Sequence, residues 1–326
     1  MIRSYEELME EWENPMEWLE CHTSGSTGEP KMIHLPKKEM IASALRSIHY
    51  FGLSADSLLY SCISPEFIGG KMVWIRANVL GCRFGYETPT NTPLKDYHGG
   101  AIDLISVVPS QLIYILANPS IQPFLRKILV GGAPINEMLR KKIVESGLEV
   151  YESYGMTETA SHIALRRITI PQEPFKVLPG IKVFGSDGRM EIEIEGWQRI
   201  VTNDLVRFVS QTSFYIDGRA DNIIISGGRK IIPEKIEEAL FPHIPGQFCI
   251  TSLPDDKWGE RVVLAMADTR ENHEDDFYLG ICRDHLEGYE VPKQVIYLKE
   301  LPLTSGGKIS RKKLKEQAAE RSLENC

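Results

Sequence analysis

The sequence predicts an α/β protein with a large N-terminal domain built on a mostly parallel sheet, a small antiparallel β subdomain and a small α+β C-terminal domain. Three observations predict this class. Apolar strand-like segments alternate with helical patterns from residue 38 to about residue 165. Short alternating segments follow over residues 175–217, and helices and strands mix again after that. Alternation of strand and helix favours a parallel sheet with helices on its faces.

The expected elements of the large domain can be read in chain order. The N-terminal stretch MIRSYEELMEEWENP reads as a short amphipathic helix that stops near Pro15. Gly147 stands where a helix C-cap is expected. Ligands of such folds bind at the carboxyl ends of the strands. The expected strands cover residues 58–63, 101–108, 127–132 and 148–155, and the expected helices cover residues 37–50, 109–117 and 135–147.

The second half of the chain changes character. The segments MEIEIE, RIVT, LVRFVS and SFYIDG alternate as in an antiparallel sheet or a small barrel. A helix over 233–240, a strand over 261–267, a helix over 277–286, a strand over 294–298 and a basic C-terminal helix then form a compact unit. We therefore expect two domains, residues 1–220 and 221–326, with the boundary near Asp221.

Composition excludes several classes of function. The 326 residues carry a net charge of −8, so we expect no nucleic-acid binding through bulk charge. No apolar run approaches the ~20 residues that span a bilayer, and the acidic N-terminus is not a secretory signal. The six cysteines show no C-x-x-C pair and suit a reducing, cytoplasmic location. The eight histidines show no H-E-x-x-H spacing.

The stretch TSGSTGEPK, residues 23–31, concentrates hydroxyl and glycine residues before a lysine. It reads either as a polar surface loop or as a phosphate-binding loop, because glycine allows close approach of the backbone and hydroxyls donate to phosphate. The common nucleotide P-loop does not fit. Gly25 and Gly28 are too close together, and Met32 follows Lys31 where a hydroxyl is needed.

Four further motifs carry polar chemistry after predicted strands or near glycines. YESYGMTETA offers a threonine hydroxyl for phosphate and a glutamate for Mg²⁺, although a capped turn would explain it too. VGGAPI, residues 130–135, is weak alone, because a tight turn explains it equally well. GRADNIIISGGRK includes Asp221, and LPLTSGGKISRKK places Lys308 after two glycines, where a flexible loop is the plain alternative.

The order and spacing of these motifs resemble the adenylate-forming family of acyl- and aryl-CoA synthetases, adenylation domains and luciferases. The resemblance runs from about Thr23 to Lys315 and favours the phosphate-loop interpretation. It implies ATP, Mg²⁺ and coenzyme A as ligands and a small, mobile C-terminal domain. In this family a carboxylate attacks the α-phosphorus of ATP to give acyl-AMP, and the thiol of coenzyme A then displaces AMP. The enzyme mainly positions the reactants and neutralises charge.

The resemblance also implies roles for particular residues. Lys308, Thr157 and Glu158 are expected to be catalytic, with Glu158 as the magnesium ligand and Asp221 as the hinge. Asp204 is expected to accept from the ribose, with Arg219 nearby. The remaining nucleotide residues are expected to be Thr23, Ser24, Gly25, Ser26, Thr27, Gly28, Lys31, Gly132, Ala133, Tyr154 and Gly155. Gly227 and Gly228 are expected to line the thiol channel, and Arg76 and Ser161 the acid pocket.

Within the family, the segments GRADNIIISGG, GGKISRKKLK and GGKMVWIRANVLG resemble the ligases that join o-succinylbenzoate to coenzyme A in menaquinone biosynthesis. Arg76 would then hold the second carboxylate of this aromatic acid. A structural arginine whose guanidinium reaches water or a structural carboxylate is the plain alternative. A ligase for another acid, an enzyme that loads a carrier protein and a regulator that has lost catalysis also remain open.

Two departures from the family pattern stand out. Only 22 residues precede the hydroxyl and glycine loop, where the family has a hundred or more. We expect that the enzyme is short by nature or that a homodimer covers the exposed face. Relatives also often carry an aromatic–histidine pair before the substrate helix, whereas SPEFIGG offers Phe67 without a histidine.

Overall fold

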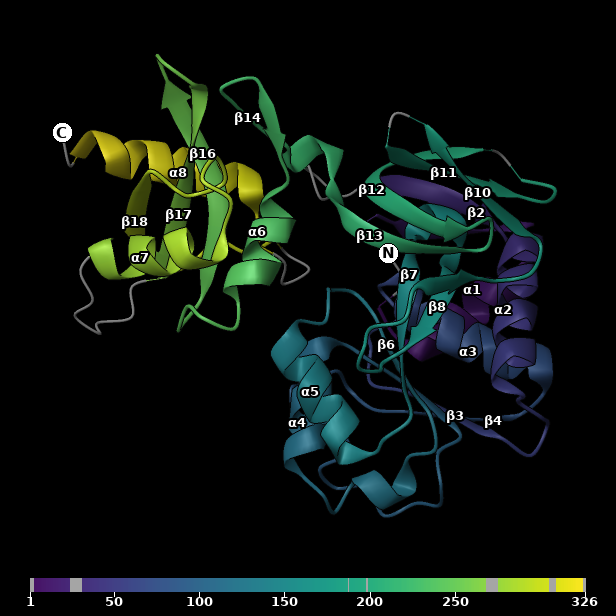
Figure 1. Cartoon of the computed structure of the whole chain (residues 1–326). Coiled ribbons are helices and arrows are strands. Elements are labelled where there is room, and N and C mark those ends of the chain that lie inside the picture. Colours follow the sequence, from purple (N-terminus) through teal and green to yellow (C-terminus); the bar gives the residue numbers. More distant parts are fainter. Residues whose placement is uncertain are drawn as a thin grey trace. The chain divides into compact units, whose positions relative to one another are not determined.

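The computed structural model describes residues 3–23, 31–186, 188–197, 199–267, 275–304 and 309–324 (Figure 1). Two compact units divide the chain. The first comprises residues 1–184, 191–200 and 208–214, and the second comprises residues 185–190, 201–207 and 215–326. The predicted boundary at Asp221 and the mobility of the second domain stay predictions.

The first unit begins with a helix and a hairpin that precede the main sheet. Ser4 caps the first helix by accepting from the amide of Glu7, and Asn136 caps α5 by accepting from the amide of Leu139. Gly147 ends α5 in a left-handed conformation, as predicted. The helices are α1 (Tyr5–Glu13), α2 (Lys37–Phe51), α3 (Ile68–Leu80), α4 (Pro109–Ala117) and α5 (Glu137–Ser146), with short 3₁₀ turns η1 (Gln122–Phe124) and η2 (Thr157–Thr159).

The main sheet has eleven strands in the order β10-β11-β12-β13-β9-β8-β7-β6-β5-β3-β4. The strands from β3 to β7 pair in parallel, and β7, β8, β9 and β13 pair antiparallel. The segments β10 to β13 continue this sheet. Its strands are β3 (Leu58–Ser61), β4 (Arg83–Tyr86), β5 (Leu104–Val107), β6 (Ile128–Val130), β7 (Val150–Met156), β8 (Ser161–Arg167), β9 (Phe175–Val177), β10 (Ile181–Ser186), β11 (Arg189–Ile194), β12 (Ile200–Ser210) and β13 (Ser213–Arg219).

Helices cover both faces of the parallel strands (Figure 1). On one face α4 and α5 bury a cluster that includes Val107, Leu112 and Ile143. On the other side α1, α2 and α3 bury a second cluster with the hairpin β1 (Trp18–His22) and β2 (Met32–Pro36). This burial on both faces explains why the central strands β3, β5 and β6 read as nearly continuous apolar runs.

The second unit contains its own sheet, in the order β15-β14-β17-β16 with β18 paired to β17. Alternation along β17 sends Val262 and Leu264 into the cluster under α6 and α7, and Val263 and Ala265 into the cluster under α8. Its elements are η3 (Ala220–Asn222), β14 (Ile224–Ser226), β15 (Arg229–Ile231), α6 (Pro233–Leu240), β16 (Phe248–Asp255), β17 (Gly259–Ala267), α7 (Asp275–His285), β18 (Gln294–Leu298) and α8 (Arg311–Glu324).

The predicted α/β class with its mostly parallel sheet and antiparallel additions is confirmed.

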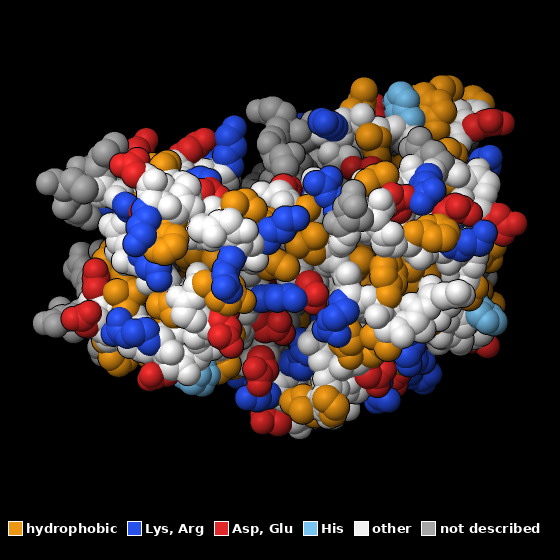
Figure 2. Space-filling view, turned by 45° about the horizontal axis from the view of Figure 1, so that its top comes forward, with side chains coloured by type: hydrophobic (Ala, Val, Ile, Leu, Met, Phe, Trp, Pro, Cys, Tyr) orange, Lys and Arg blue, Asp and Glu red, His pale blue; other side chains and the backbone are white. Residues whose placement is uncertain are grey.

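Lys and Arg side chains mix with Asp and Glu side chains over the face shown in Figure 2. The five cysteines within the described ranges are free thiols.

Candidate active site

The carboxyl ends of β6 and β7 lie at one edge of the sheet, because these strands run parallel. Gly132 and Ala133 lie two and three residues after the end of β6. Gly155 lies near the end of β7, and Thr157 and Glu158 follow in η2. Five residues that the sequence predicts for nucleotide binding therefore share the edge at which ligands of α/β sheets bind.

The β1–β2 hairpin carries the hydroxyl and glycine loop. The amide of Thr23 donates to the carbonyl of Lys31 at 2.9 Å, and the amide of Lys31 donates to the Thr23 hydroxyl at 3.3 Å. These bonds clamp the two ends of the loop. The Trp18 ring stacks on His34 farther down the hairpin, with 3.8 Å between centroids. Ser24, Gly25, Ser26, Thr27 and Gly28 lie outside the described residues.

Thr157 connects this hairpin to the sheet edge. Its hydroxyl donates to the carbonyl of His22, the last residue of β1, at 3.4 Å. Glu158 is partly buried, and its carboxylate has no hydrogen bond or ion pair within the described part of the chain. A single hard carboxylate beside the predicted phosphate-binding loop would fit the way Mg²⁺ is usually held, by few protein ligands and the phosphates themselves.

The turn after η2 is strained. Ala160 and Ser161 both have positive φ, +49° and +86°, which non-glycine residues adopt only when their surroundings compensate. The Thr159 hydroxyl donates to the carbonyl of Ser161 at 2.6 Å, and the Ser43 hydroxyl of α2 donates to the carbonyl of Ala160 at 2.8 Å. These two bonds fix the direction in which the chain enters β8.

Gly155 makes this turn possible. A Cβ at that position would lie 2.2 Å from the carbonyl oxygen of Ser161 and 2.5 Å from the Cα of His162. Both are backbone atoms, so no side-chain rotation could relieve the clash. The glycine is therefore required by the close approach of β8.

Arg76 lies on α3 and is 1% exposed. One of its terminal nitrogens lies 3.4 Å from Nδ1 of His162, and the Ser161 hydroxyl lies 3.5 Å from the same nitrogen. The structure therefore brings the two predicted acid-pocket residues, Arg76 and Ser161, together around His162. Burial lowers the pKa of Arg76 to about 10, so the guanidinium remains charged near neutral pH.

His162 is also completely buried, and α2 supplies its second contact. The Ser47 hydroxyl lies 2.8 Å from Nε2 of His162. Burial, followed by the charges of Arg76 and Arg46, holds the pKa of His162 well below its ordinary value. The imidazole is therefore neutral.

A protein-family comparison decides the affiliation of the chain. Residues 18–190, more than half of the chain, match the family model described as AMP-binding enzyme. The chain belongs to the AMP-binding enzyme family. It is thus an adenylate-forming acyl-CoA ligase of the AMP-forming type, with the fold that the resemblance implied.

Three relatives place this AMP-binding enzyme more closely. It is 32% identical to the acyl-CoA synthetase (AMP-forming)/AMP-acid ligase II-like protein of Dyadobacter fermentans, whose structure superposes with a TM-score of 0.60 over 95% of this chain and 91% of that chain. It is 29% identical to the 2-succinylbenzoate–CoA ligase of Listeria monocytogenes over 95% of this chain and 72% of that enzyme.

The third relative is the o-succinylbenzoate CoA synthetase of Bacillus subtilis. Its complex with the acyl-adenylate superposes with a TM-score of 0.80 at 22% identity, over 91% of this chain and 68% of that chain. Its complex with ATP and a magnesium ion superposes at 0.77 and 21% identity over 91% and 69%. This likeness shows a shared fold. Within the described ranges, no helix of the enzyme is long and apolar enough to cross a membrane.

Asp204 and Arg219 of this AMP-binding enzyme meet in the second unit. Nη1 of Arg219 lies 3.1 Å from Oδ1 of Asp204. Nε and Nη2 of Arg219 donate to Oδ1 and Oδ2 of Asp221 at 2.9 and 2.8 Å. The predicted proximity of Asp204 and Arg219 is therefore present, and the proposed hinge residue is held by the same arginine.

The backbone conformation of the enzyme explains why residues 227 and 228 are glycines. They form the two-residue turn between β14 and β15, where Ser226 pairs with Arg229. Both have positive φ, +57° and +76°, as such hairpin turns require. A Cβ on Gly227 would also lie 2.8 Å from the Trp258 ring. Turn geometry thus explains both glycines, and their role in a thiol channel stays a prediction.

Lys308 lies outside the described residues. Its flanks are fixed, since the amide of Ser310 donates to the carbonyl of Pro302 at 2.7 Å. Arg311 at the start of α8 donates to both oxygens of Glu237 on α6, at 3.0 and 2.7 Å. This bidentate pair anchors the chain three residues after Lys308.

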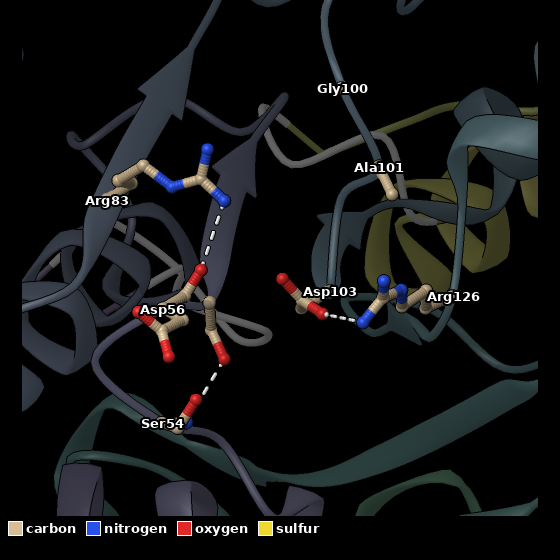
Figure 3. A pocket seen from close by; sticks show the side chains of 8 residues that line it. Ser54, Asp56, Arg83, Gly100, Ala101, Asp103 and Arg126 are labelled. Atoms are coloured by element: carbon tan, nitrogen blue, oxygen red, sulfur yellow. Dashed lines mark hydrogen bonds and ion pairs between the residues drawn. The ribbon is translucent and has the colours of Figure 1, made fainter.

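A polar pocket of about 350 Å³ opens at the opposite edge of the main sheet (Figure 3). Arg83, Asp103 and Arg126 lie just before or at the start of β4, β5 and β6. Arg126 pairs there with Asp103 at 2.8 Å. Because the pocket lies at the amino ends of these strands, it is not at the ligand-binding edge, and we assign it no role.

Sequence reasoning missed Arg46 and His162. His162 lies two residues after the end of the motif YESYGMTETA, and this proximity is the signal in the sequence that points to it. Nothing in the sequence near Arg46 sets it apart from other helix-surface arginines.

Proposed function

We propose that this enzyme adenylates o-succinylbenzoate with ATP and transfers the acyl group to coenzyme A, as a step of menaquinone biosynthesis. The Listeria and Bacillus relatives carry this activity in their names. At 29% identity the substrate does not follow from the family alone. The support from the chain itself comes from Arg76.

Arg76 is the observation that carries the proposal. Its guanidinium is 1% exposed, and its Nε has no hydrogen-bond partner in the described structure. No carboxylate of the described chain pairs with it. A buried unpaired charge is costly, so the site is incomplete without an anion. A planar guanidinium binds a carboxylate through two parallel bonds.

o-Succinylbenzoate supplies such an anion. Its succinyl carboxylate is the one that reacts with ATP. Its benzoate carboxylate must then stay ionised in a pocket that also receives an aromatic ring. Acids with a single carboxylate have no second anion to offer, and Arg76 would penalise their binding.

The first step would use the sheet edge. The Thr23–Lys31 loop would hold the β- and γ-phosphates, Thr157 the α-phosphate, and Gly132, Ala133 and Tyr154 the adenine. Glu158 would hold Mg²⁺, which neutralises phosphate charge. Lys308 would bridge the α-phosphate and the attacking carboxylate, since its charge sits on a flexible stem.

The second step would use the C-terminal domain. Rotation about Asp221 would remove Lys308 and bring the Gly227–Gly228 turn toward the thiol. Asp204 would hold the ribose in both states. These roles rest on the family resemblance.

A panel of carboxylic acids tests the proposal. Each acid is incubated with ATP, Mg²⁺ and coenzyme A, and products are identified by mass spectrometry. We expect o-succinylbenzoyl-CoA, AMP and pyrophosphate as the main products. A different preferred acid would overturn the substrate. Acyl-AMP without any CoA thioester would indicate transfer to a carrier protein, and no pyrophosphate with any acid would indicate a regulator.

A further inference from the structure

Arg46 of α2 is a second arginine whose charge acts on His162, the residue that contacts Arg76. It immediately precedes Ser47, whose hydroxyl contacts His162. Its Nε and Nη2 atoms are buried, and neither has a hydrogen-bond partner in the described structure. Burial lowers the pKa of Arg46, and the charge of Glu39 partly opposes this.

The charges around His162 do not balance. Arg46 and Arg76 contribute two positive charges, and His162 contributes none. Glu39 contributes one negative charge, which it shares with the exposed Lys38 at 3.9 Å. At least one positive charge is left without a partner within the described ranges, which matches the charge of one additional carboxylate.

Hydrogen-bond direction fixes the state of His162. A guanidinium can only donate, so Nδ1 of His162 must accept from Arg76. Nε2 must then carry the proton and donate to Ser47 at 2.8 Å. The Ser47 hydroxyl donates onward to the carbonyl of Ser43 at 3.2 Å. Each donor along this path meets an acceptor only when the imidazole is neutral with its proton on Nε2.

This path couples the arginine to the rigid part of the site. Ser43, at the far end, also holds the carbonyl of Ala160 in the strained turn. A protonated imidazole would lose its acceptor and face Arg76 with like charge. The neutral ring therefore aims the Arg76 guanidinium without cancelling its charge, and this leaves the charge for a ligand.

From this arrangement we propose that Arg46 and His162 are specificity-determining residues that commit the acid pocket to substrates with a second, distal carboxylate. His162 is a positioning residue that orients Arg76, and Arg46 supplies additional positive charge. This inference rests on the proposed function and adds two residues to it. An acid without the distal anion would leave the guanidinium unpaired, and sites built for a polar group reject analogues that lack it.

The test compares two acids across matched variants. kcat and KM for acyl-AMP formation are measured with the best dicarboxylic acid from the panel and with its analogue lacking the distal carboxylate. The variants are Arg46→Gln, His162→Leu and His162→Gln. Arg126→Gln at the opposite edge is the control for loss of an arginine, since its side chain is 66% exposed there.

We expect Arg46→Gln and His162→Leu to lower kcat/KM for the dicarboxylic acid about tenfold or more, mainly through KM. Their effect on the analogue should stay within about twofold on the same scale. His162→Gln should keep most activity, because an amide also offers one acceptor and one donor. The control should change neither acid.

Three results would overturn the inference: equal losses for both acids, no loss in Arg46→Gln, or a wild-type preference for an acid with a single carboxylate. If His162→Leu fails to fold, Arg46→Gln decides alone. If wild type prefers a dicarboxylic acid other than o-succinylbenzoate and the pattern holds, the inference stands and the proposed substrate is wrong.

Discussion

Arg76 is the residue on which the proposed specificity for the acid substrate depends. Helix α3 is apolar on nearly every side and buries residues 70–77, so its arginine has no route to solvent. Its exposure of 1% excludes a guanidinium that reaches water. No carboxylate among the described residues pairs with it, and its role in binding the second carboxylate stays a proposal.

The first prediction concerns Arg76 itself. Arg76→Ala should lower kcat/KM for o-succinylbenzoate by a factor that corresponds to about 2–5 kcal/mol, as for loss of one partner of a buried charge pair. Arg76→Lys keeps the charge but loses the planar fork, so the loss should be smaller. Steady-state kinetics with melting temperatures check both. Normal turnover by a less stable Arg76→Ala protein would make the residue structural.

The second prediction uses the neutral state of His162. Arg76, Ser47 and Ser161 contact the ring, the charge of Arg46 acts on it, and none of the four residues carries a negative charge. The pKa of His162 in the folded protein lies below its pKa in the unfolded chain, about 6.5. At pH values between these two pKa values, the unfolded chain binds a proton on His162 and the folded protein does not. Wild type should therefore lose stability as pH falls below about 6.5.

The matched variant isolates this effect. His162→Gln cannot take up the proton, so its stability should fall less, by about 1.4 kcal/mol per pH unit in the window. Urea unfolding of both proteins at pH 7.5 and pH 5.5 measures the difference. Parallel losses in the two proteins would show that other groups control the acid sensitivity.

At the scale of elements, the turn between β7 and β8 carries the site. The third prediction is that Gly155→Ala destabilises the protein by about 1–3 kcal/mol or more, because overpacking here displaces backbone. Gly280→Ala in α7 is the matched control, since its nearest neighbour is 4.0 Å away at the tip of Arg283. Thermal unfolding should separate the two. Equal melting temperatures would mean that the turn relaxes without cost.

The fourth prediction concerns the segment between β18 and α8. Lys308→Ala should lower acyl-AMP formation roughly 10²-fold, on the scale of one lost transition-state contact. Thioester formation from supplied acyl-AMP should survive. Lys312→Ala, exposed on α8, is the control. Equal loss of both half-reactions would contradict the proposal that Lys308 acts in adenylation and leaves the site before the thioester forms.

Several elements could be read from the sequence, and others could not. The strands β3, β5 and β6 were predictable because burial on both faces leaves clear apolar runs, whereas β7 alternates between buried and partly exposed residues. The hairpin strands β1 and β2 and the strand β16 are not among the strands that the sequence predicts. β1 and β2 are only five residues long and carry polar residues on one side. Such short alternations resemble loops until a partner strand is known.

The site shows the same division. Motif residues that follow strands, such as Thr157 and Glu158, could be predicted because topology brings strand ends together. The roles proposed for Arg46 and His162 depend on the packing of α2 and α3 against β8, which no motif in the sequence indicates. The only sequence signal is the position of His162 just after the motif YESYGMTETA. The net charge around a buried site depends on residues that lie far apart in the sequence, and no periodic pattern in the sequence reveals it.

At the scale of the whole molecule, the two units raise the question of movement. The fifth prediction is that Asp221→Pro keeps adenylation and stalls thioester formation, because proline fixes φ at a hinge that must change. Asp221→Ala removes the bonds to Arg219 but keeps backbone freedom, and serves as the control. Single-turnover assays of each half-reaction measure the effect. Normal thioester turnover in Asp221→Pro would locate the hinge elsewhere.

The stacked rings of Trp18 and His34 have a practical consequence. Imidazole in contact with indole quenches its fluorescence, and the pair sits on the hairpin that carries the hydroxyl and glycine loop. The hairpin therefore contains its own optical reporter. A change in Trp18 emission on addition of nucleotide, absent in a Trp18→Phe protein, would let nucleotide binding beside this hairpin be timed in a stopped-flow instrument without any attached dye.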